Sequence, residues 1–600
     1  MTTVDEPAQR AFDPDALREK YRAERDKRLR DDGNDQYVEV TGDFAHFVDD
    51  PYVAPVEREP RFDEVDMVVI GGGFGGLLAG ARLKEAGITD IHIVEKGGDF
   101  GGTWYWNRYP GAQCDIEAYI YLPLLEELGY VPKEKYTRAA EILEHSRNIA
   151  DHYGLYDGAL FQTEVTTLTW DDDRSRWLVA TNRGDELRAR FVCMASGPLH
   201  RPKLPGVPGV GSFAGHTFHT SRWDYEYTGG DSEGGLTKLA DKVVGIIGTG
   251  ATAVQCVPHL GEGAKHLYVF QRTPSSIDVR NNRPTDPRWA ASLEPGWQQR
   301  RMENFNNLVT GIPEPEDLVG DGWTDIIGKL LLQMRQADTT DTSPEGVAKT
   351  VELADFEKME SIRARVDTII NDPTTAESLK PYYRQFCKRP CFHDEYLQTY
   401  NRPNVTLVDT NGHGIDRITE RGVVVGETEY ELDCLVFATG FEVGTDFTRR
   451  AGCEVIGRGG QTLTEKWHDG AATLHGMHTH GFPNLLIFSL QQSGFTANFP
   501  HALDEQSRHA AYILRHVVEN DLTTFEVTQE AEDAWVETII ELAQFNLDFL
   551  ESCTPGYYNN EGKPSERGIR NGFYGAGSVA FFKVIADWRD TGELPGLELT

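Results

Sequence analysis

The 600-residue sequence has no apolar run near the roughly 20 residues that a membrane-spanning helix needs, which argues against an integral membrane protein. Basic residues are also scarce, with 59 Lys and Arg against 95 Asp and Glu, giving a net charge of −36. Such a charge repels nucleic acids and anionic membranes, so neither is expected as a partner. The first 30 residues lack the apolar segment of a secretory leader, and we expect a cytoplasmic protein.

Cysteine is sparse as well, with 8 residues spread along the chain. They form no CxxC pair and no dense disulfide framework, so neither a stapled secreted domain nor a common metal motif is indicated. Cys387 and Cys391 have only three residues between them. We expect this spacing to be incidental and predict no metal site.

Two βαβ patterns are present instead. In the first, an apolar strand at 65–70 leads through glycines at 71–76 into a helix at 77–86 and a second strand at 91–94. The same order recurs as a strand at 243–247, a turn at 248–250, a helix at 251–260 and a strand at 266–271. The sequence therefore predicts an α/β fold with two dinucleotide-binding, Rossmann-like units.

The first glycine loop satisfies GxGxxG through Gly71, Gly73 and Gly76. Glycines at these positions allow a tight turn, close approach of backbone N–H groups to a pyrophosphate, and close packing of helix on strand. Glu95 ends the following strand, where a carboxylate can hold the ribose of a dinucleotide. Together these residues predict a binding site for FAD.

The second loop fits the variant GxGxxA and predicts a nicotinamide dinucleotide. Its residues are Gly248, Thr249, Gly250 and Ala253. The strand that follows ends in Gln271, Arg272 and Thr273, so a cation stands near the place where NAD sites offer an acid. Because a guanidinium can pair with a 2′-phosphate through two charge-assisted hydrogen bonds, Arg272 favours NADPH over NADH.

These features divide the chain into six expected segments. A charged stretch at 284–380 is expected to be a helical insertion, with helices near 324–336 and 347–371, and short strands return near 405–408, 423–425 and 432–438. The expected segments are an N-terminal extension (1–62), the FAD-binding domain (63–200 and 433–600, the latter with a C-terminal substrate loop), the NADPH-binding domain (201–283 and 381–432) and the insertion (284–380).

Two longer motifs identify a family resemblance. The segment 213–224 matches the pattern FxGxxxHxxxW followed by Pro or Asp, and 101–115 matches [AG]GxWx4[FY]P[GM]x3D. The chain thereby resembles the class B flavoprotein Baeyer–Villiger monooxygenases, and its long N-terminal extension is similar to that of the larger members acting on steroids or macrocyclic ketones. The residues that carry the first motif are Phe213, Gly215, His219, Trp223 and Asp224.

The resemblance implies a reaction and roles for particular residues. NADPH would reduce FAD, and O2 would add to give a flavin peroxide that converts a bulky cyclic or steroidal ketone to an ester or lactone. Arg389 matches the family's arginine beside the flavin, Asp115 matches the carboxylate that positions it, and Lys388 is expected near the NADPH phosphate. The second motif adds Gly102, Thr103 and Trp104 to the expected cofactor contacts.

The sequence departs from the family pattern in its last part. Smaller members have a Trp in a substrate loop, where this chain has the segment 553–560 beginning at Cys553. The resemblance therefore assigns no coenzyme or substrate contact to that loop. The ketone, the side of oxygen insertion and the oligomeric state are likewise not predicted.

Other functions fit the sequence less well. A flavin monooxygenase that oxidises nitrogen or sulfur uses the same cofactors, but its motif usually ends in an aromatic other than the Trp223-Asp224 pair. A pyridine nucleotide disulfide reductase needs a redox cysteine pair after the first βαβ unit, where Cys114 has no neighbour. A flavin-binding sensor without activity would not need Arg389.

Overall fold

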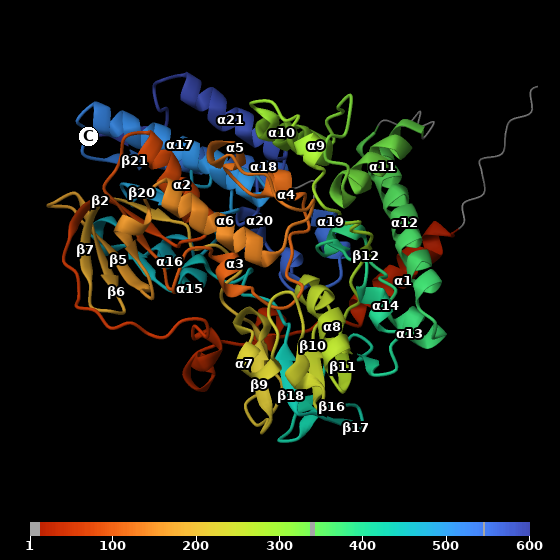
Figure 1. Ribbon diagram of the computed structural model, residues 1–600. Coiled ribbons are helices and arrows are strands. Elements are labelled where there is room, and N and C mark those ends of the chain that lie inside the picture. The colour runs from red at the N-terminus through yellow and green to blue at the C-terminus, as the bar shows by residue number, and fades with distance from the viewer. Residues whose placement is uncertain (1–11, 337–342, 544–546) are drawn as a thin grey trace, which may run out of the picture.

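The computed structural model describes residues 12–336, 343–543 and 547–600 (Figure 1). The first eleven residues, on which part of the expectation about a leader depends, lie outside the described residues. Within the described ranges, no helix is long and apolar enough to cross a membrane.

The larger of the two main sheets contains the first predicted βαβ unit. β2 pairs in parallel with β3 on one side and with β7 on the other, and β7 also pairs with β20. The order is β19-β5-β6-β7-β2-β3-β4, with β20 beside β7. The predicted strands at 65–70 and 91–94 are confirmed. The strands are β2 (Glu64–Ile70), β3 (Ile91–Val94), β4 (Ala159–Leu160), β5 (Val165–Asp171), β6 (Arg176–Thr181), β7 (Glu186–Met194), β19 (Glu454–Ile456) and β20 (Leu485–Ile487).

The smaller sheet contains the second predicted unit and is parallel throughout, in the order β14-β11-β10-β18-β9. Its central strands β10 and β18 are nearly continuous apolar runs, as expected of strands covered on both faces. The expected boundary between the NADPH-binding and FAD-binding domains, at residue 433, is wrong by one strand. β18 still pairs with β10 and β9 of this sheet before the chain leaves it. The strands are β9 (His216–His219), β10 (Val243–Ile247), β11 (His266–Gln271), β14 (Val405–Asp409) and β18 (Cys434–Phe437).

Short strands complete the β structure. β12 pairs in parallel with β13, and β1 of the N-terminal extension pairs with β8. The bounds are β1 (Tyr37–Val38), β8 (Leu204–Pro205), β12 (Ile277–Asp278), β13 (Cys391–Phe392), β15 (Arg417–Ile418), β16 (Gly422–Val425), β17 (Thr428–Glu431), β21 (Phe525–Val527) and β22 (Leu597–Leu599).

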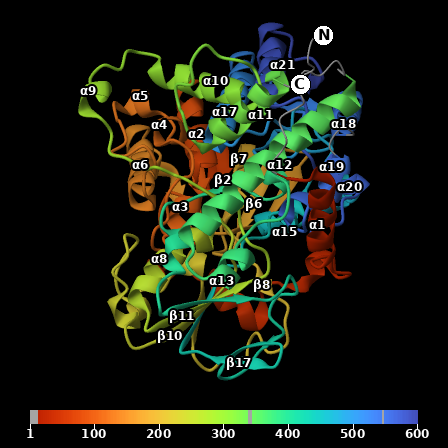
Figure 2. The same cartoon turned by 90° about the vertical axis from the view of Figure 1, so that its right-hand side faces the viewer.

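Helices cover both sheets and form the insertion. α2 packs against α17 over the larger sheet, and α11 packs against α12 in the insertion, which crosses the molecule in Figure 2. The main helices are α1 (Pro14–Asp26), α2 (Phe74–Glu85), α6 (Ala139–His152), α8 (Ala251–Gly263), α10 (Trp297–Val309), α11 (Gly322–Gln336), α12 (Pro344–Ile369), α17 (Phe499–Glu519), α18 (Gln529–Ala543) and α21 (Ser578–Asp590).

The remaining α-helices are short. They are α3 (Thr103–Trp106), α4 (Ala118–Tyr121), α5 (Leu125–Leu128), α7 (Tyr225–Thr228), α9 (Pro287–Ala290), α13 (Pro373–Ser378), α14 (Tyr396–Thr399), α15 (Phe447–Ala451), α16 (Leu463–Lys466), α19 (Leu547–Ser552) and α20 (Glu566–Arg570).

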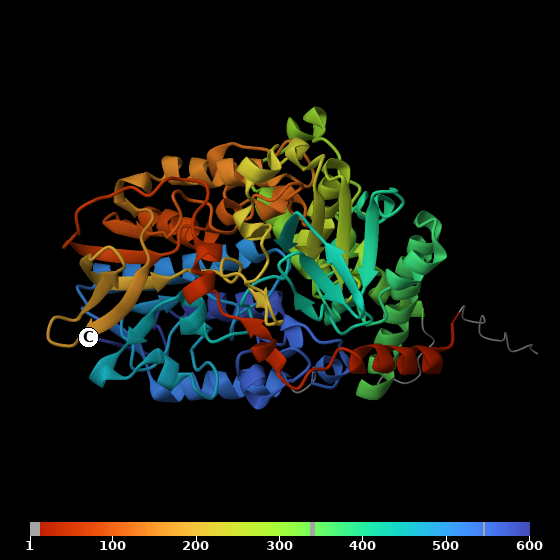
Figure 3. The ribbon, with the colours of Figure 1, turned by 90° about the horizontal axis from the view of Figure 1, so that it is seen from below.

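The N-terminal extension wraps across the molecule rather than leading straight into the first sheet. α1 lies beside α12, where Arg18 pairs with Glu352 at 2.7 Å (Figure 3). Further along, Arg28 donates from Nε to the Thr273 hydroxyl at 3.1 Å, next to the second glycine loop. The extension is thus part of the wall of the expected coenzyme site.

Candidate active site

The first glycine loop has the geometry of a dinucleotide site. Gly71 has φ +108°, and a Cβ there would lie 2.5 Å from the Ala195 carbonyl oxygen. A Cβ on Gly76 would lie 1.9 Å from the Gly71 oxygen, so both positions require glycine. Gly73 is the N-cap of α2, whose free N–H groups and positive dipole end favour a pyrophosphate.

Glu95 is 5% exposed at the end of β3 and is fixed by this loop. Its carboxylate oxygens accept hydrogen bonds from Gly72 N–H at 2.6 Å and Gly97 N–H at 2.7 Å. Burial raises the pKa of Glu95, and the two N–H donors oppose that rise. Each oxygen retains a further lone pair, so the residue can also accept from a ribose diol.

The second family motif meets the first loop directly. Gly102 has φ +51°, and a Cβ there would lie 2.5 Å from the Gly73 Cα, so the two segments touch. Gly102 is also the N-cap of α3, which begins at Thr103. Trp104 is 8% exposed and donates from its indole N–H to the Tyr121 hydroxyl at 3.1 Å. The motif therefore forms the second wall of the first loop.

The second glycine loop leaves open space at its centre. Gly248 has φ +113°, and a Cβ there would meet the Ala438 oxygen at 2.4 Å, whereas a Cβ on Gly250 would meet nothing within 4 Å. Thr249 donates its hydroxyl to the Thr273 carbonyl at 2.7 Å, and Ala253 is fully buried in α8. The space in front of Gly250 suits a pyrophosphate held at the N-terminus of α8.

Arg272 lies beside this loop, but its guanidinium has partners that the sequence did not indicate. It donates to the Gln36 side-chain oxygen at 2.6 Å and lies 3.5 Å from the Glu561 carboxylate. Lys388 is an electrostatic neighbour: burial first, and then the Arg272 charge, lower its pKa to about 8. The structure therefore brings Arg272 and Lys388 together, from either side of the insertion.

Arg389 and Asp115 form the central ion pair of the site. Arg389 donates from Nε and Nη2 to the two oxygens of Asp115, both at 2.9 Å. Burial lowers the pKa of Arg389, but the charge and hydrogen bonds of Asp115 outweigh it and hold that pKa well above its usual range. The side chains are 30% and 20% exposed, so the cation is fixed in orientation yet accessible.

Two elements hold this pair in place. β13 begins two residues after Arg389 and pairs with β12, so this segment lies beside the stretch of chain that follows β11 and Arg272. From the insertion, Trp323 donates its indole N–H to the Asp115 carbonyl at 3.2 Å, and its ring lies 5.0 Å from the Arg389 guanidinium carbon. The role of Trp323 has no signal in the sequence, because it depends on packing of the insertion.

The fingerprint residues, which are those of the family motif at 213–224, lie along β9 at the edge of the smaller sheet and in the turns beside it, and not on the ion pair. His219 is fully buried at the end of β9, with Nδ1 2.9 Å from the Ser221 hydroxyl, and burial lowers its pKa to about 3. Trp223 is 1% exposed, and its indole N–H donates to the Thr228 hydroxyl. Such a histidine is uncharged near neutral pH.

The other fingerprint residues also have structural contacts. Asp224 caps α7 by accepting from Tyr227 N–H, and a Cβ on Gly215 would lie 2.6 Å from the Phe213 ring. Sequence reasoning missed Arg222, whose guanidinium carbon lies 3.7 Å from the ring centre of Trp106 in α3. This contact joins the fingerprint to the first dinucleotide site.

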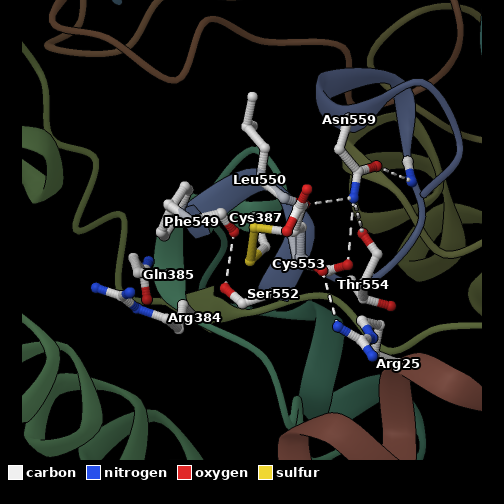
Figure 4. Close-up of a disulfide and its surroundings, with 12 residues drawn as sticks. Arg25, Arg384, Gln385, Cys387, Phe549, Leu550, Ser552, Cys553, Thr554 and Asn559 are labelled. Carbon is white, nitrogen blue, oxygen red and sulfur yellow. Dashed lines mark hydrogen bonds between the residues drawn. A yellow bond between two sulfur atoms is a disulfide. The ribbon is translucent and has the colours of Figure 1, made fainter. Parts of the chain in front are cut away.

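A disulfide joins Cys387 to Cys553, across 166 residues (Figure 4). Cys387 thus pairs with the C-terminal loop and not with Cys391, which is free and buried. The bond lies two residues from Arg389 and ties the start of the segment 553–562 to the active site. Nothing in the sequence pattern pointed to this pairing, because two distant cysteines give no spacing signal.

These features define a class of protein: a flavoprotein with two dinucleotide folds and one fixed guanidinium where the folds meet. The family model for pyridine nucleotide-disulphide oxidoreductases matches residues 68–319, which include both glycine loops. That match reflects the shared fold, because Cys114 is a free, buried thiol.

Two similar proteins sharpen the assignment. The chain is 58% identical over 590 residues to a neopentalenolactone D synthase of Streptomyces avermitilis, covering 98% of this chain and 99% of that protein. It is 52% identical over 591 residues to the Baeyer–Villiger monooxygenase ATR8 of Stachybotrys chlorohalonatus, covering 98% and 95%.

Solved structures agree. A polycyclic ketone monooxygenase from Thermothelomyces thermophila superposes with a TM-score of 0.91 at 40% identity, covering 98% of this chain and 99% of that one. A complex of OTEMO with FAD and NADP superposes with a TM-score of 0.72 at 26% identity, covering 90% and 100%. The chain belongs to the Baeyer–Villiger monooxygenase family.

Proposed function

We propose that this protein is an FAD- and NADPH-dependent Baeyer–Villiger monooxygenase that uses O2 to convert bulky cyclic ketones to lactones or esters. The observation that carries the proposal is the bidentate Arg389–Asp115 pair, in a chain whose two glycine loops both have dinucleotide geometry. An oriented, accessible guanidinium next to a redox cofactor suits a reaction in which negative charge develops on oxygen.

The two loops divide the cofactors between them. Gly71, Gly73 and Gly76 with Glu95 would hold FAD, and Gly102 closes that site against Gly73. Gly248, Gly250 and the cations Arg272 and Lys388 would hold NADPH, with the 2′-phosphate at the cations. The bound flavin supplies the redox and oxygen chemistry.

The residues of this chain then have separate tasks. Arg389 stabilises negative charge at oxygen, and Asp115 positions its planar fork and keeps it charged. Trp323 and the β12–β13 pairing keep that fork in one orientation. His219 is buried at the end of β9 and, with its pKa lowered to about 3, is no proton donor near neutral pH.

A bulky substrate is supported by the names of similar proteins, which include a polycyclic ketone monooxygenase and a ketocytochalasin monooxygenase. The insertion and the C-terminal segment both reach the ion pair and so can shape a large ketone pocket.

The test is a screen of ketones with the purified FAD-loaded enzyme. We expect NADPH consumption to match a product that has gained one oxygen atom from ¹⁸O-labelled O2, with polycyclic ketones turned over faster than cyclohexanone. NADPH consumption with no oxygenated ketone product would contradict the proposal. A thioether in the same screen tests sulfur oxidation, which should be the weaker activity.

A further inference from the structure

A carboxylate from the C-terminal segment lies among the cations of the proposed coenzyme site. One oxygen of Glu561 lies 3.5 Å from Arg272 Nη2, and the other lies 3.6 Å from Lys203 Nζ and accepts from the Tyr37 hydroxyl at 3.3 Å. Glu561 is only 3% exposed. An acidic side chain is buried at this point because the cations compensate it.

The contacts of Glu561 are weaker than those of a tight ion pair. Charge-assisted hydrogen bonds between nitrogen and oxygen are normally about 2.7 to 2.9 Å long, as they are between Arg389 and Asp115. Both cations lie well beyond that range from Glu561. The carboxylate is therefore held by the charge of the cluster and can be exchanged for another anion.

The cations outnumber the carboxylate. The charge of Glu561 acts on Lys203, Arg272 and Lys388. Burial, followed by the Arg272 charge, lowers the pKa of Lys388. Among the described residues, the Lys388 ammonium has no hydrogen bond or ion pair. Even with Glu442, a second carboxylate that acts on Lys203, the cations remain in excess, which suits the roughly −1.5 to −2 charge of a phosphate monoester.

The backbone of the segment around Glu561 is fixed by a disulfide and by hydrogen bonds. Cys553 is bonded to Cys387, and the Asn559 side chain donates to the Cys553 carbonyl and accepts from Gly556 N–H (Figure 4). Glu561 itself has φ +54°, in the left-handed region that non-glycine residues rarely adopt. Asn559 Oδ1 also accepts from Gly562 N–H at 3.1 Å, and Glu561 N–H donates to the Gly556 carbonyl at 2.8 Å. The backbone is therefore held on both sides of Glu561, and the carboxylate can leave the cations by rotation of its side chain.

We propose that Glu561 determines coenzyme selectivity by competing with the 2′-phosphate of NADPH for Arg272, Lys203 and Lys388. The inference rests on the proposed assignment of Arg272 to that phosphate. NADPH carries a group that can displace the carboxylate from the cations, whereas NADH does not. The measured binding free energy of NADPH then contains the phosphate's interaction with the cations minus the interaction that the carboxylate loses.

The test measures binding of NADP⁺, NAD⁺ and adenosine 2′,5′-bisphosphate to the oxidised, FAD-loaded enzyme by calorimetry. Glu561→Gln and Glu561→Ala remove the competing charge and should tighten NADP⁺ and the bisphosphate by about fivefold, the size of a partly screened charge interaction. NAD⁺ affinity should stay within about twofold. Glu561→Asp keeps the charge and should bind NADP⁺ nearly as the parent does.

Glu566→Gln is the matched control, because Glu566 is exposed on α20 and loses the same charge away from the cluster. Equal or weaker NADP⁺ binding in both neutral Glu561 variants would overturn the inference and show that Glu561 orients Arg272 instead. Arg272→Ala separates the two proposals. If that variant leaves the NADP⁺ to NAD⁺ ratio unchanged, the phosphate assignment fails; if the ratio falls while the Glu561 variants behave as the parent, only the competition fails.

Discussion

At the scale of single residues, the Arg389–Asp115 pair shows how a charge is kept both fixed and usable. Desolvating two ions costs several kcal/mol, and the cost is recovered only when the geometry is good and hydrogen bonds are satisfied. Both donors of the pair lie at 2.9 Å, which is the short, paired arrangement that recovers it. Removing either partner leaves the other charge uncompensated.

Arg389→Lys should fold and keep FAD but lose most oxygenated product. Lysine keeps the charge but cannot make two parallel hydrogen bonds to Asp115, so charge without geometry should cost about 100-fold in product formation. The measurement is product per NADPH consumed, with flavin content taken from absorbance. Arg384→Lys, in the same segment and near Asp355, is the control and should retain activity. A fully active Arg389→Lys enzyme would remove this residue from the chemistry.

Asp115→Asn should give a milder form of the same defect. The amide has the shape of the carboxylate, but its NH2 group replaces one of the two oxygens that accept from Arg389. Arg389 therefore loses part of its orientation while its own charge remains. We expect a fall of about tenfold in kcat with little change in KM for the ketone. A fall in FAD content that accounts for the whole loss would show that Asp115 has only a structural role.

At the scale of elements, the two strand–glycine–helix units give matched tests of which loop holds which cofactor. Gly250→Val places its side chain in open space and should leave the fold and FAD intact while weakening NADP⁺ binding. Gly73→Val lies against Gly102 and should release FAD. Flavin absorbance and NADP⁺ titration of both variants separate the sites. Loss of FAD from Gly250→Val would reverse the assignment of the loops.

The elements of both units could be predicted from the sequence, since apolar runs and glycine spacing are local. The strands at 243–247 and 266–271 lie where the pattern placed them. The partners of Arg272 could not be predicted, because Gln36 and Glu561 are brought to it by packing across 236 and 289 residues. Nor could the contact of Trp323 with Asp115 be predicted, because helix periodicity does not say where an insertion docks.

At the scale of the whole molecule, the disulfide closes a loop of the chain between two residues 166 apart, one of them close to Arg389. Cross-linking residues 166 apart restricts the unfolded chain and should stabilise the fold by about 2 to 4 kcal/mol. Cys553→Ser should lower the melting temperature, and added dithiothreitol should lower that of the parent but not of the variant. Cys391→Ser, at a free buried cysteine, should leave the response to reductant intact. An identical response of parent and Cys553→Ser to reductant would contradict this.

Acid should destabilise the protein through a buried histidine cluster formed by His475, His478 and His509. The ring centroid of His509 lies 5.4 Å from that of His475 and 6.3 Å from that of His478. Neither nitrogen of His478 or of His509 has a hydrogen-bond partner among the described residues. Burial lowers the pKa of His475 and of His478 to about 3, and burial followed by the neighbouring histidines holds that of His509 well below its usual range.

Because these folded-state pKa values lie below the unfolded value of 6.5, the unfolded chain binds more protons as the pH falls. Stability is therefore retained above pH 6.5 and lost from there down to about pH 3, by up to about 1.4 kcal/mol per pH unit for each histidine. Urea unfolding between pH 7.5 and about 5 measures the slope. His509→Leu, which cannot bind a proton, should flatten it, whereas His468→Gln, at an exposed side chain, should not. If His509→Leu keeps the parent slope, the acid sensitivity arises outside this cluster.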